Sequence, residues 1–265
     1  MNSPQLALPR KPRNYPAIAA ATLVFVITAI TLSPGIGVDA DFSSIANNWQ
    51  QGLERIASML TPQWSFFPET VQPIIETLAM AIIATVLGSA ISLPLAFLTA
   101  RTTNPNRVLQ WTFRIIVNVV RSMPELLYAA ILVAMVGVGA LPGILALVLF
   151  NIGIMAKLVS EAIESNSTGP LEAGRAAGGT SVQVARTMAL PDVWPQFLSQ
   201  ALFTFEINVR ASSVLGLVGA GGIGLLIDSV RTYYQYDKLS LIILEILVIV
   251  VVLESVSAWL RKKVS

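Results

Sequence analysis

The sequence predicts an all-α integral membrane protein with about six transmembrane helices. Apolar residues make up 54% of the chain and charged residues 12%, which is about half the charged share of a soluble protein. Long apolar runs with few charges recur, as bilayer-spanning helices require. A polar loop between two of these runs carries the cap and turn residues of two short helices. Cys and His are both absent, which excludes disulfides, thiol chemistry and histidine proton relays.

We expect the six helices at residues 17–32, 71–100, 124–138, 141–159, 197–218 and 239–260. The third run is short for a bilayer of about 30 Å. It therefore begins earlier, within 108–120, or this upstream segment forms a separate helix at the cytoplasmic surface. The first run resembles a signal peptide, but Leu32-Ser33-Pro34-Gly35 is a poor cleavage site, so we interpret it as a retained helix.

The chain divides by hydropathy into a basic tail at 1–16, a first helix with an outer loop at 17–70, a core at 71–260 and a basic end at 261–265. The outer loop is amphipathic and predicts a helix resting on the membrane surface. Its apolar positions are Phe42, Ile45, Trp49, Leu53, Ile56 and Leu60. With six spans, most of the 17 basic residues fall on one side. The positive-inside rule then places both termini in the cytoplasm.

The polar loop at 165–195 has its own local pattern. The Gly178-Gly179 pair is suited to end a short helix, because glycine adopts the left-handed conformation without a steric penalty. Thr180 then begins a second helix with Gln183 three residues on, which is the spacing of a capping box. Leu190-Pro191 is expected to stop that helix. The pattern predicts a helix–turn–helix outside the bilayer.

The same loop resembles the signature of permease subunits of bacterial ATP-binding-cassette importers. That signature reads EAA, three residues, G, nine residues, I, any residue, LP. Gly174 replaces its second alanine and Met188 its isoleucine, and Gly174 is expected to loosen the helix by about 1 kcal/mol. The resemblance implies that the loop docks into a groove on a separate ATPase subunit. The residues expected to serve this coupling are Glu172, Ala173, Gly174, Gly178, Gly179, Leu190 and Pro191.

Two charged residues lie deep in the fifth run, where each costs about 2.5–3.5 kcal/mol at mid-bilayer unless it is paired or hydrated. Glu206 and Arg210 are four residues apart and share one helical face. One interpretation is that they neutralise each other or a neighbouring helix. The other is that Arg210 lines a passage for an anion, with Glu206 orienting it and Asn208 in the same path. Glu76 and Glu245 are expected at helix contacts or in an outer cavity.

A second resemblance concerns the substrate. The segments Phe205–Arg210, Leu215–Gly224, Arg121–Leu126 and Lys157–Glu164 resemble permeases of phosphonate importers. The glycine run is weaker support, because methionine importer permeases have a similar one. Its glycines are expected at a gate or in close helix packing; they are Gly219, Gly221, Gly222 and Gly224.

The resemblance implies a homodimer in a bacterial inner membrane that takes up phosphonate, phosphate or phosphite. Two ATPase subunits would bind ATP and Mg, and an extracytoplasmic binding protein would deliver the substrate. No Gly-Lys pair occurs, so the chain is not expected to bind nucleotide. We predict no catalytic or metal-ligating residues, no nucleic-acid partner and contact with membrane lipid. A methionine importer permease, an ion-gradient transporter and a membrane scaffold remain alternatives, although the internal repeats typical of gradient-driven transporters are not found.

Overall fold

The computed structural model describes residues 15–32 and 43–264, which form helices and no strands. They divide into two compact units, one up to Ile56 and one from Ala57 onward, and the division expected at residue 70 stays a prediction. The first unit contains α1 (Tyr15–Thr31), α2 (Ser43–Asn47) and most of α3 (Trp49–Met59). The α1 helix has 17 residues, fewer than the roughly 20 that usually span a bilayer.

The amphipathic stretch expected in the outer loop is helical. Within α3, Trp49, Leu53 and Ile56 are all exposed on one side, as a helix on a membrane surface requires. Phe42, the first residue of the expected stripe, lies outside the described residues.

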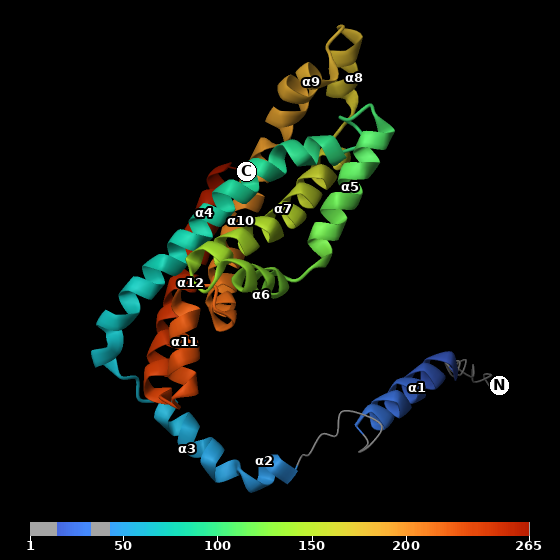
Figure 1. Ribbon diagram of the computed structural model, residues 1–265. Helices are drawn as coiled ribbons and strands as arrows, with labels where there is room; N and C mark the ends of the chain where they lie inside the picture. The colour runs from blue at the N-terminus through green and yellow to red at the C-terminus, as the bar shows by residue number, and fades with distance from the viewer. Residues whose placement is uncertain (1–14, 33–42, 265) are drawn as a thin grey trace, which may run out of the picture. The chain divides into compact units, whose positions relative to one another are not determined.

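The second unit holds the long helices (Figure 1). Its elements are η1 (Trp64–Phe66), α4 (Phe67–Thr99), α5 (Arg107–Ser122), α6 (Glu125–Val136), α7 (Ala140–Ser165), α8 (Gly169–Ala176), α9 (Ser181–Val184), the π-helical η2 (Ala185–Ala189), α10 (Leu190–Leu215), η3 (Gly216–Val218), α11 (Ile223–Thr232) and α12 (Tyr236–Val264). Among the described residues, four helical runs are long and apolar enough to cross a membrane: Trp64–Thr99, Ala140–Ser165, Ser181–Val218 and Tyr236–Lys263.

The expected third span is a broken pair of helices. α5 and α6 meet at an angle of 86° and count as a fifth span only if taken together. The bend lies at Met123, which is extended (φ −92°, ψ 132°) because the ring of Pro124 disfavours a helical conformation in the preceding residue. The segment upstream of 124 is thus a helix of its own, with its own direction.

α7 is the central helix of this unit and contacts α4, α5, α6 and α10. Its closest neighbour is α4, where Gly88 leaves no space for a side chain against Asn151. The Asn151 amide donates to the carbonyl of Ala84 at 3.0 Å. A small residue such as Gly88 lets two helix backbones approach closely. This close packing helps to hold helices together in a bilayer, where the lipid is as apolar as the side chains.

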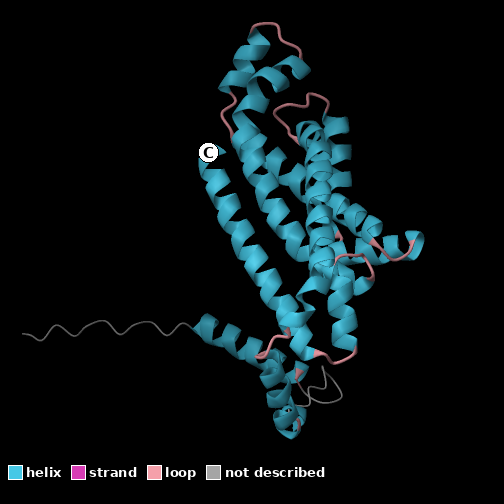
Figure 2. Ribbon diagram, turned by 90° about the vertical axis from the view of Figure 1, so that its left-hand side faces the viewer, coloured by secondary structure: helices cyan, strands magenta, loops and turns pink. Residues whose placement is uncertain are grey.

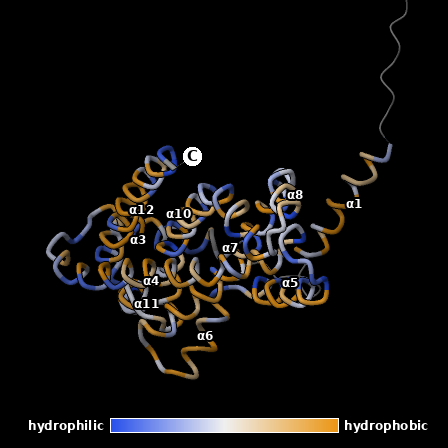
Figure 3. The backbone as a smooth tube through the Cα atoms, turned by 90° about the horizontal axis from the view of Figure 1, so that it is seen from above, coloured by the Kyte–Doolittle hydropathy of each residue, from blue (hydrophilic) through white to orange (hydrophobic). Residues whose placement is uncertain are grey.

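α12 runs along the outside of the unit beside α10 (Figure 2). Only 17% of its most apolar window is buried in the chain. In Figure 3 the backbone of α12 is mostly coloured as hydrophobic and becomes hydrophilic at its C-terminal end, where Arg261, Lys262 and Lys263 follow one another. An apolar surface of this length is suited to lipid or to another membrane helix.

Candidate functional site

The helix–turn–helix at 165–195 forms one tip of the second unit (Figure 1). α8 ends at Ala176, and Gly178 then takes a left-handed conformation with φ +84°. The N–H groups of Gly178 and Gly179 donate to the carbonyls of Arg175 and Gly174, at 3.0 and 3.1 Å. The glycine pair thus closes the first helix as the sequence predicts.

The capping box that begins the second helix is complete. The backbone N–H of Gln183 donates to Oγ1 of Thr180 at 3.4 Å, and the Thr180 N–H donates to Oε1 of Gln183 at 2.8 Å. These reciprocal bonds satisfy donors at the helix start. They fix the direction in which the chain leaves the glycine turn.

The prediction that Leu190-Pro191 stops this helix is wrong. The chain stays helical from Ser181 to Val218, and Pro191 lies in the first turn of α10. The π-helical turn η2 directly before it supplies the reason. A wider turn moves the preceding carbonyls away from the proline ring, which otherwise clashes with the carbonyl four residues earlier. The loop therefore continues into the long helix without a break.

Gly174 is a packing residue. It is buried, and a Cβ atom there would lie 3.2 Å from Cγ2 of Val184 and 3.4 Å from Cγ of Met188. Glycine at position 174 is expected to lower the stability of the short helix, but it also allows the two short helices to approach each other closely. Glu172, Ala173 and Gly178 are exposed, and Glu172 accepts a bond from the Thr168 hydroxyl at 3.0 Å. These exposed residues form an outer face that a partner can contact.

The inner side of the loop packs on α4 through Phe97. Leu171, Val184 and Ala189 form a small buried core, and Phe97 packs against it. Phe97 also packs against the core shared by α4, α7 and α10. Sequence reasoning missed this residue, since one phenylalanine in an apolar run carries no distinguishing signal.

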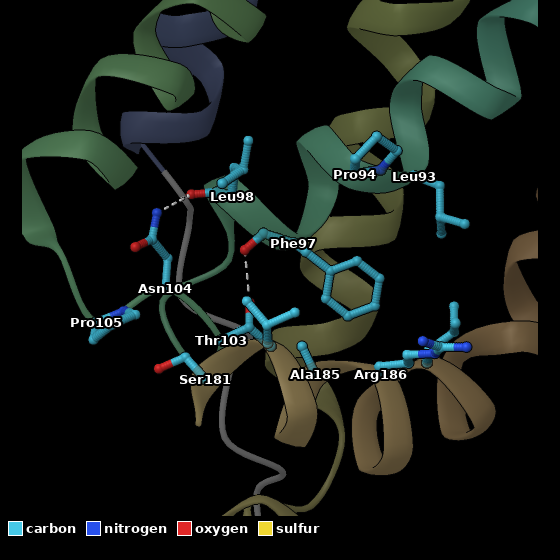
Figure 4. A pocket seen from close by; sticks show the side chains of 12 residues that line it. Leu93, Pro94, Phe97, Leu98, Thr103, Asn104, Pro105, Ser181, Ala185 and Arg186 are labelled. Carbon is cyan, nitrogen blue, oxygen red and sulfur yellow. Dashed lines mark hydrogen bonds between the residues drawn. The ribbon is translucent and has the colours of Figure 1, made fainter. Parts of the chain in front are cut away.

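A largely apolar cavity of about 490 Å³ separates the rest of α9 and η2 from the end of α4. Figure 4 shows the Phe97 ring directed from α4 towards Ala185 across this space. Leu93 and Pro94 of α4 lie on one side, and Val182 and Ala185 lie on the other. Phe97 therefore bridges the cavity between α4 and the loop. Elsewhere along the cavity, the loop and α4 are not packed against each other.

Polar bonds hold the base of the loop. Asn166 donates to Oδ2 of Asp192 at 2.7 Å, which joins the end of α7 to the start of α10. The Arg175 guanidinium donates to the carbonyl of Thr102, in the connection between α4 and α5. These bonds tie the base of the loop to the end of α7, the start of α10 and the α4–α5 connection.

Glu206 and Arg210 do not pair with each other. Glu206, 6% exposed, binds Arg261 at 2.8 Å, and Arg210 binds Glu254 at 3.2 Å. Glu254 and Arg261 are seven residues apart and share a face of α12, which presents opposite charges to both members of the expected pair. Both charges are therefore neutralised by charged residues of a neighbouring helix, which is one of the alternatives given above.

Arg261, the partner of Glu206, begins the basic end of α12. The depth of Glu206 in the membrane stays a prediction. Arg210, one turn further along, has a side chain 49% exposed.

Asn208 is buried between α10 and α4. Its amide nitrogen donates to Oγ1 of Thr85 at 2.8 Å, while its Oδ1 has no partner among the described residues. The role in a substrate path that the sequence suggests for Glu206, Asn208 and Arg210 stays a prediction.

The glycine run forms a tight junction at the other end of α10. Gly219, Gly221 and Gly222 have positive φ values, and Gly224 lies against the backbone of Gly216. The backbone of Gly222 donates to Oε1 of Glu76 at 3.2 Å, and that of Ile223 donates to Oγ1 of Thr77 at 2.7 Å. α4 thus caps the start of α11, a helix that the sequence reading did not include. Close packing is observed here, and a gate stays a prediction.

Residues 92–265 match the model of the family described as binding-protein-dependent transport system inner membrane component. The chain is 42% identical over 215 residues to the phosphite transport system permease protein PtxC of Stutzerimonas stutzeri, covering 80% of this chain and 78% of that protein. It is 40% identical over 189 residues to the phosphate-import permease protein PhnE of Mycolicibacterium smegmatis, covering 71% of this chain and 35% of that protein. A solved structure of the MetNI methionine ABC transporter, in an inward facing conformation, superposes with a TM-score of 0.68 at 26% identity, over 77% of this chain and 99% of that chain.

Proposed function

This chain belongs to the family of binding-protein-dependent transport system inner membrane components, and from that premise we propose that it is the permease subunit of an ATP-driven importer for a phosphorus oxyanion. Phosphite, phosphate and phosphonate form the substrate class. The observation that carries the proposal is the 42% identity to a phosphite permease across 80% of the chain. A methionine substrate is less well supported, because two methionine transport permeases are 28% and 32% identical over 71% and 57% of this chain.

We propose that the working assembly contains two copies of this chain, two ATPase subunits and an extracytoplasmic binding protein. ATP and Mg are held by the ATPase subunits, and both termini of this chain lie in the cytoplasm. The exposed face with Glu172, Ala173 and Gly178 supports an ATPase contact at the tip. The apolar surface of α12 supports a membrane environment of lipid or a second helix.

Two routes lead from that tip into the membrane. The helix from Ser181 to Val218 carries a displacement of the tip directly into α10. Phe97 carries it sideways into α4. A protein that alternates between two packed arrangements moves solute by binding it differently in each. We therefore assign coupling to α9–α10 and Phe97, with no chemical step in this chain.

Arg210 is the proposed contact for the anion. A guanidinium presents a planar fork that can bind two oxygens of a phosphonate or phosphate group. Its side chain is half exposed, and Glu254 offsets its charge at 3.2 Å, which favours brief binding over trapping. Selectivity is then left to the external binding protein.

The test is uptake of labelled phosphite, phosphate and methylphosphonate by vesicles that hold this chain, its ATPase and its binding protein. We expect saturable uptake that needs ATP inside the vesicles, and no uptake of labelled methionine. Methionine uptake without oxyanion uptake would reassign the substrate. Uptake driven by an ion gradient without ATP would overturn the importer proposal itself.

A further inference from the structure

We propose that a basic pocket beside α5 binds the phosphate headgroup of an anionic phospholipid at the membrane boundary. The pocket has a volume of about 750 Å³, within the usual range of small-molecule sites. Its lining residues are Arg101, Asn104, Pro105, Arg107, Val108, Gln110, Trp111 and Arg175. They include three guanidinium groups and no carboxylate. The site is separate from the Arg210 region and does not depend on which solute is transported.

The positive charge of this pocket is left uncompensated. Within the described part of the chain, Arg101 and Arg107 form no ion pair. The nearby carboxylate of Glu164 is held by the Arg114 guanidinium at 2.6 Å and by the backbone N–H of Arg101 at 2.8 Å. Clustered guanidinium groups are suited to phosphate, because each can donate two parallel hydrogen bonds to its oxygens.

An apolar stripe begins at the rim of the same pocket. Val108, Trp111, Ile115 and Val119 are exposed on α5 and recur every three or four residues. Val117, on another face of the helix, is buried. Trp111 is 68% exposed, and tryptophan concentrates where headgroups meet acyl chains. A phospholipid whose phosphate enters the pocket can lay its acyl chains along this stripe.

The stripe is the reason to prefer a lipid over a protein partner or a free anion. An acidic patch on an ATPase would match the arginines but would leave Val108 and Trp111 without an apolar contact. Inorganic phosphate would match the arginines alone. A phospholipid satisfies both halves of the site, and basic clusters beside membrane helices attract anionic lipid.

The experiment uses the complete purified assembly in nanodiscs of phosphatidylcholine containing phosphatidylglycerol, and native mass spectrometry counts the lipids retained after release. The test variant is Arg101→Gln/Arg107→Gln. The matched control is Arg121→Gln/Lys262→Gln, which removes two exposed basic residues outside the pocket. A second variant, Arg101→Lys/Arg107→Lys, keeps the charge and guards against a folding defect.

We expect the parent to retain phosphatidylglycerol over phosphatidylcholine, and the glutamine variant to lose this preference roughly 25-fold, because two basic residues contribute about fivefold each. The control keeps the preference, and the lysine variant keeps most of it. Equal retention by parent and glutamine variant, or an equal loss in the control, overturns the site. Unchanged lipid retention in Val108→Ser/Trp111→Ser, which removes the apolar contact at the rim, overturns the lipid assignment in favour of a free anion. If the glutamine variant loses the ATPase subunits but retains the same lipids as the parent, the pocket is a contact site for a protein and the lipid assignment is wrong.

Discussion

At the scale of single residues, the turn at Gly178 depends on backbone conformation alone. A Cβ atom there meets nothing within 4 Å, yet φ is +84°. The left-handed conformation costs roughly 1–2 kcal/mol for an ordinary residue and less for asparagine. The opposite holds at Gly179, where a Cβ atom would lie 2.9 Å from the Gly174 carbonyl oxygen. Two adjacent glycines in one motif are therefore needed for different reasons.

We expect Gly178→Val to uncouple transport while leaving the chain inserted, because the strained turn changes the direction of α9 relative to α8. Gly178→Asn should retain most activity. The measurement is substrate-stimulated ATP hydrolysis by reconstituted complexes at equal membrane levels. Equal hydrolysis by the valine and asparagine variants would show that the left-handed turn is not what couples the subunits.

The second prediction at this scale separates binding from neutralisation at Arg210. Arg210→Gln should slow oxyanion uptake roughly 10- to 100-fold if its charged hydrogen bonds hold the substrate. The same variant also leaves Glu254 without its partner. The double variant Arg210→Gln/Glu254→Gln removes both charges, so it should stay slow if Arg210 contacts the anion.

Glu206→Gln/Arg261→Gln is the matched control, because it removes the other ion pair between the same two helices. We expect this variant to transport at near the parental rate. Recovery of uptake in the Arg210/Glu254 double variant would assign a purely structural role to Arg210.

At the scale of helices, the sequence was sufficient where local pattern determines the structure. The capping box at Thr180, the glycine turn and the long apolar helices all follow from neighbouring residues. Prediction failed where the outcome depends on other elements. Pro191 does not stop its helix because a π turn precedes it. The sequence left open whether Glu206 pairs with Arg210 or with a neighbouring helix, and its partner Arg261 is 55 positions away. α11 was not predicted, because the glycine run before it carries no helix signal. Its first backbone donors bond to Glu76 and Thr77 of α4.

The contact between the coupling loop and α4 leads to a prediction about Phe97. Phe97→Ala removes the ring that joins the two hydrophobic cores and should lower substrate-stimulated ATP hydrolysis more than basal hydrolysis. Loss of stability should be below the roughly 3–5 kcal/mol of a fully buried phenylalanine, since Phe97 is half-buried. Both activities are measured in the reconstituted complex.

Phe203→Ala is a suitable control because Phe203 is exposed on α10. It should leave the ratio of stimulated to basal hydrolysis unchanged. Phe97→Leu should restore part of that ratio. An equal decrease of both activities in Phe97→Ala would indicate a general folding defect and would remove Phe97 from the coupling route.

At the scale of the whole molecule, the distribution of charge determines the expected orientation. Most of the 17 basic residues fall beside the coupling loop, the connection between α4 and α5, and the two chain ends. Basic residues tend to be retained in the cytoplasm during insertion, so their distribution predicts the direction of every span. We therefore expect the outer amphipathic helix and the coupling loop on opposite sides of the membrane.

The absence of cysteine from the chain allows a direct test of this arrangement. Gln51→Cys places a thiol in the amphipathic helix α3, and Val182→Cys places one in the coupling helix α9, where the native side chain is 77% exposed. An impermeant thiol reagent added to intact cells should label the first variant, whereas the second should react only after the cells are opened or in inverted vesicles. The parent chain supplies the background, since this subunit has no thiol to label. The positive-inside rule assigns the directions of all spans together. Labelling of both variants from the same side would therefore contradict the expected number of membrane crossings between α3 and α9. It would also contradict the expected cytoplasmic position of the coupling loop.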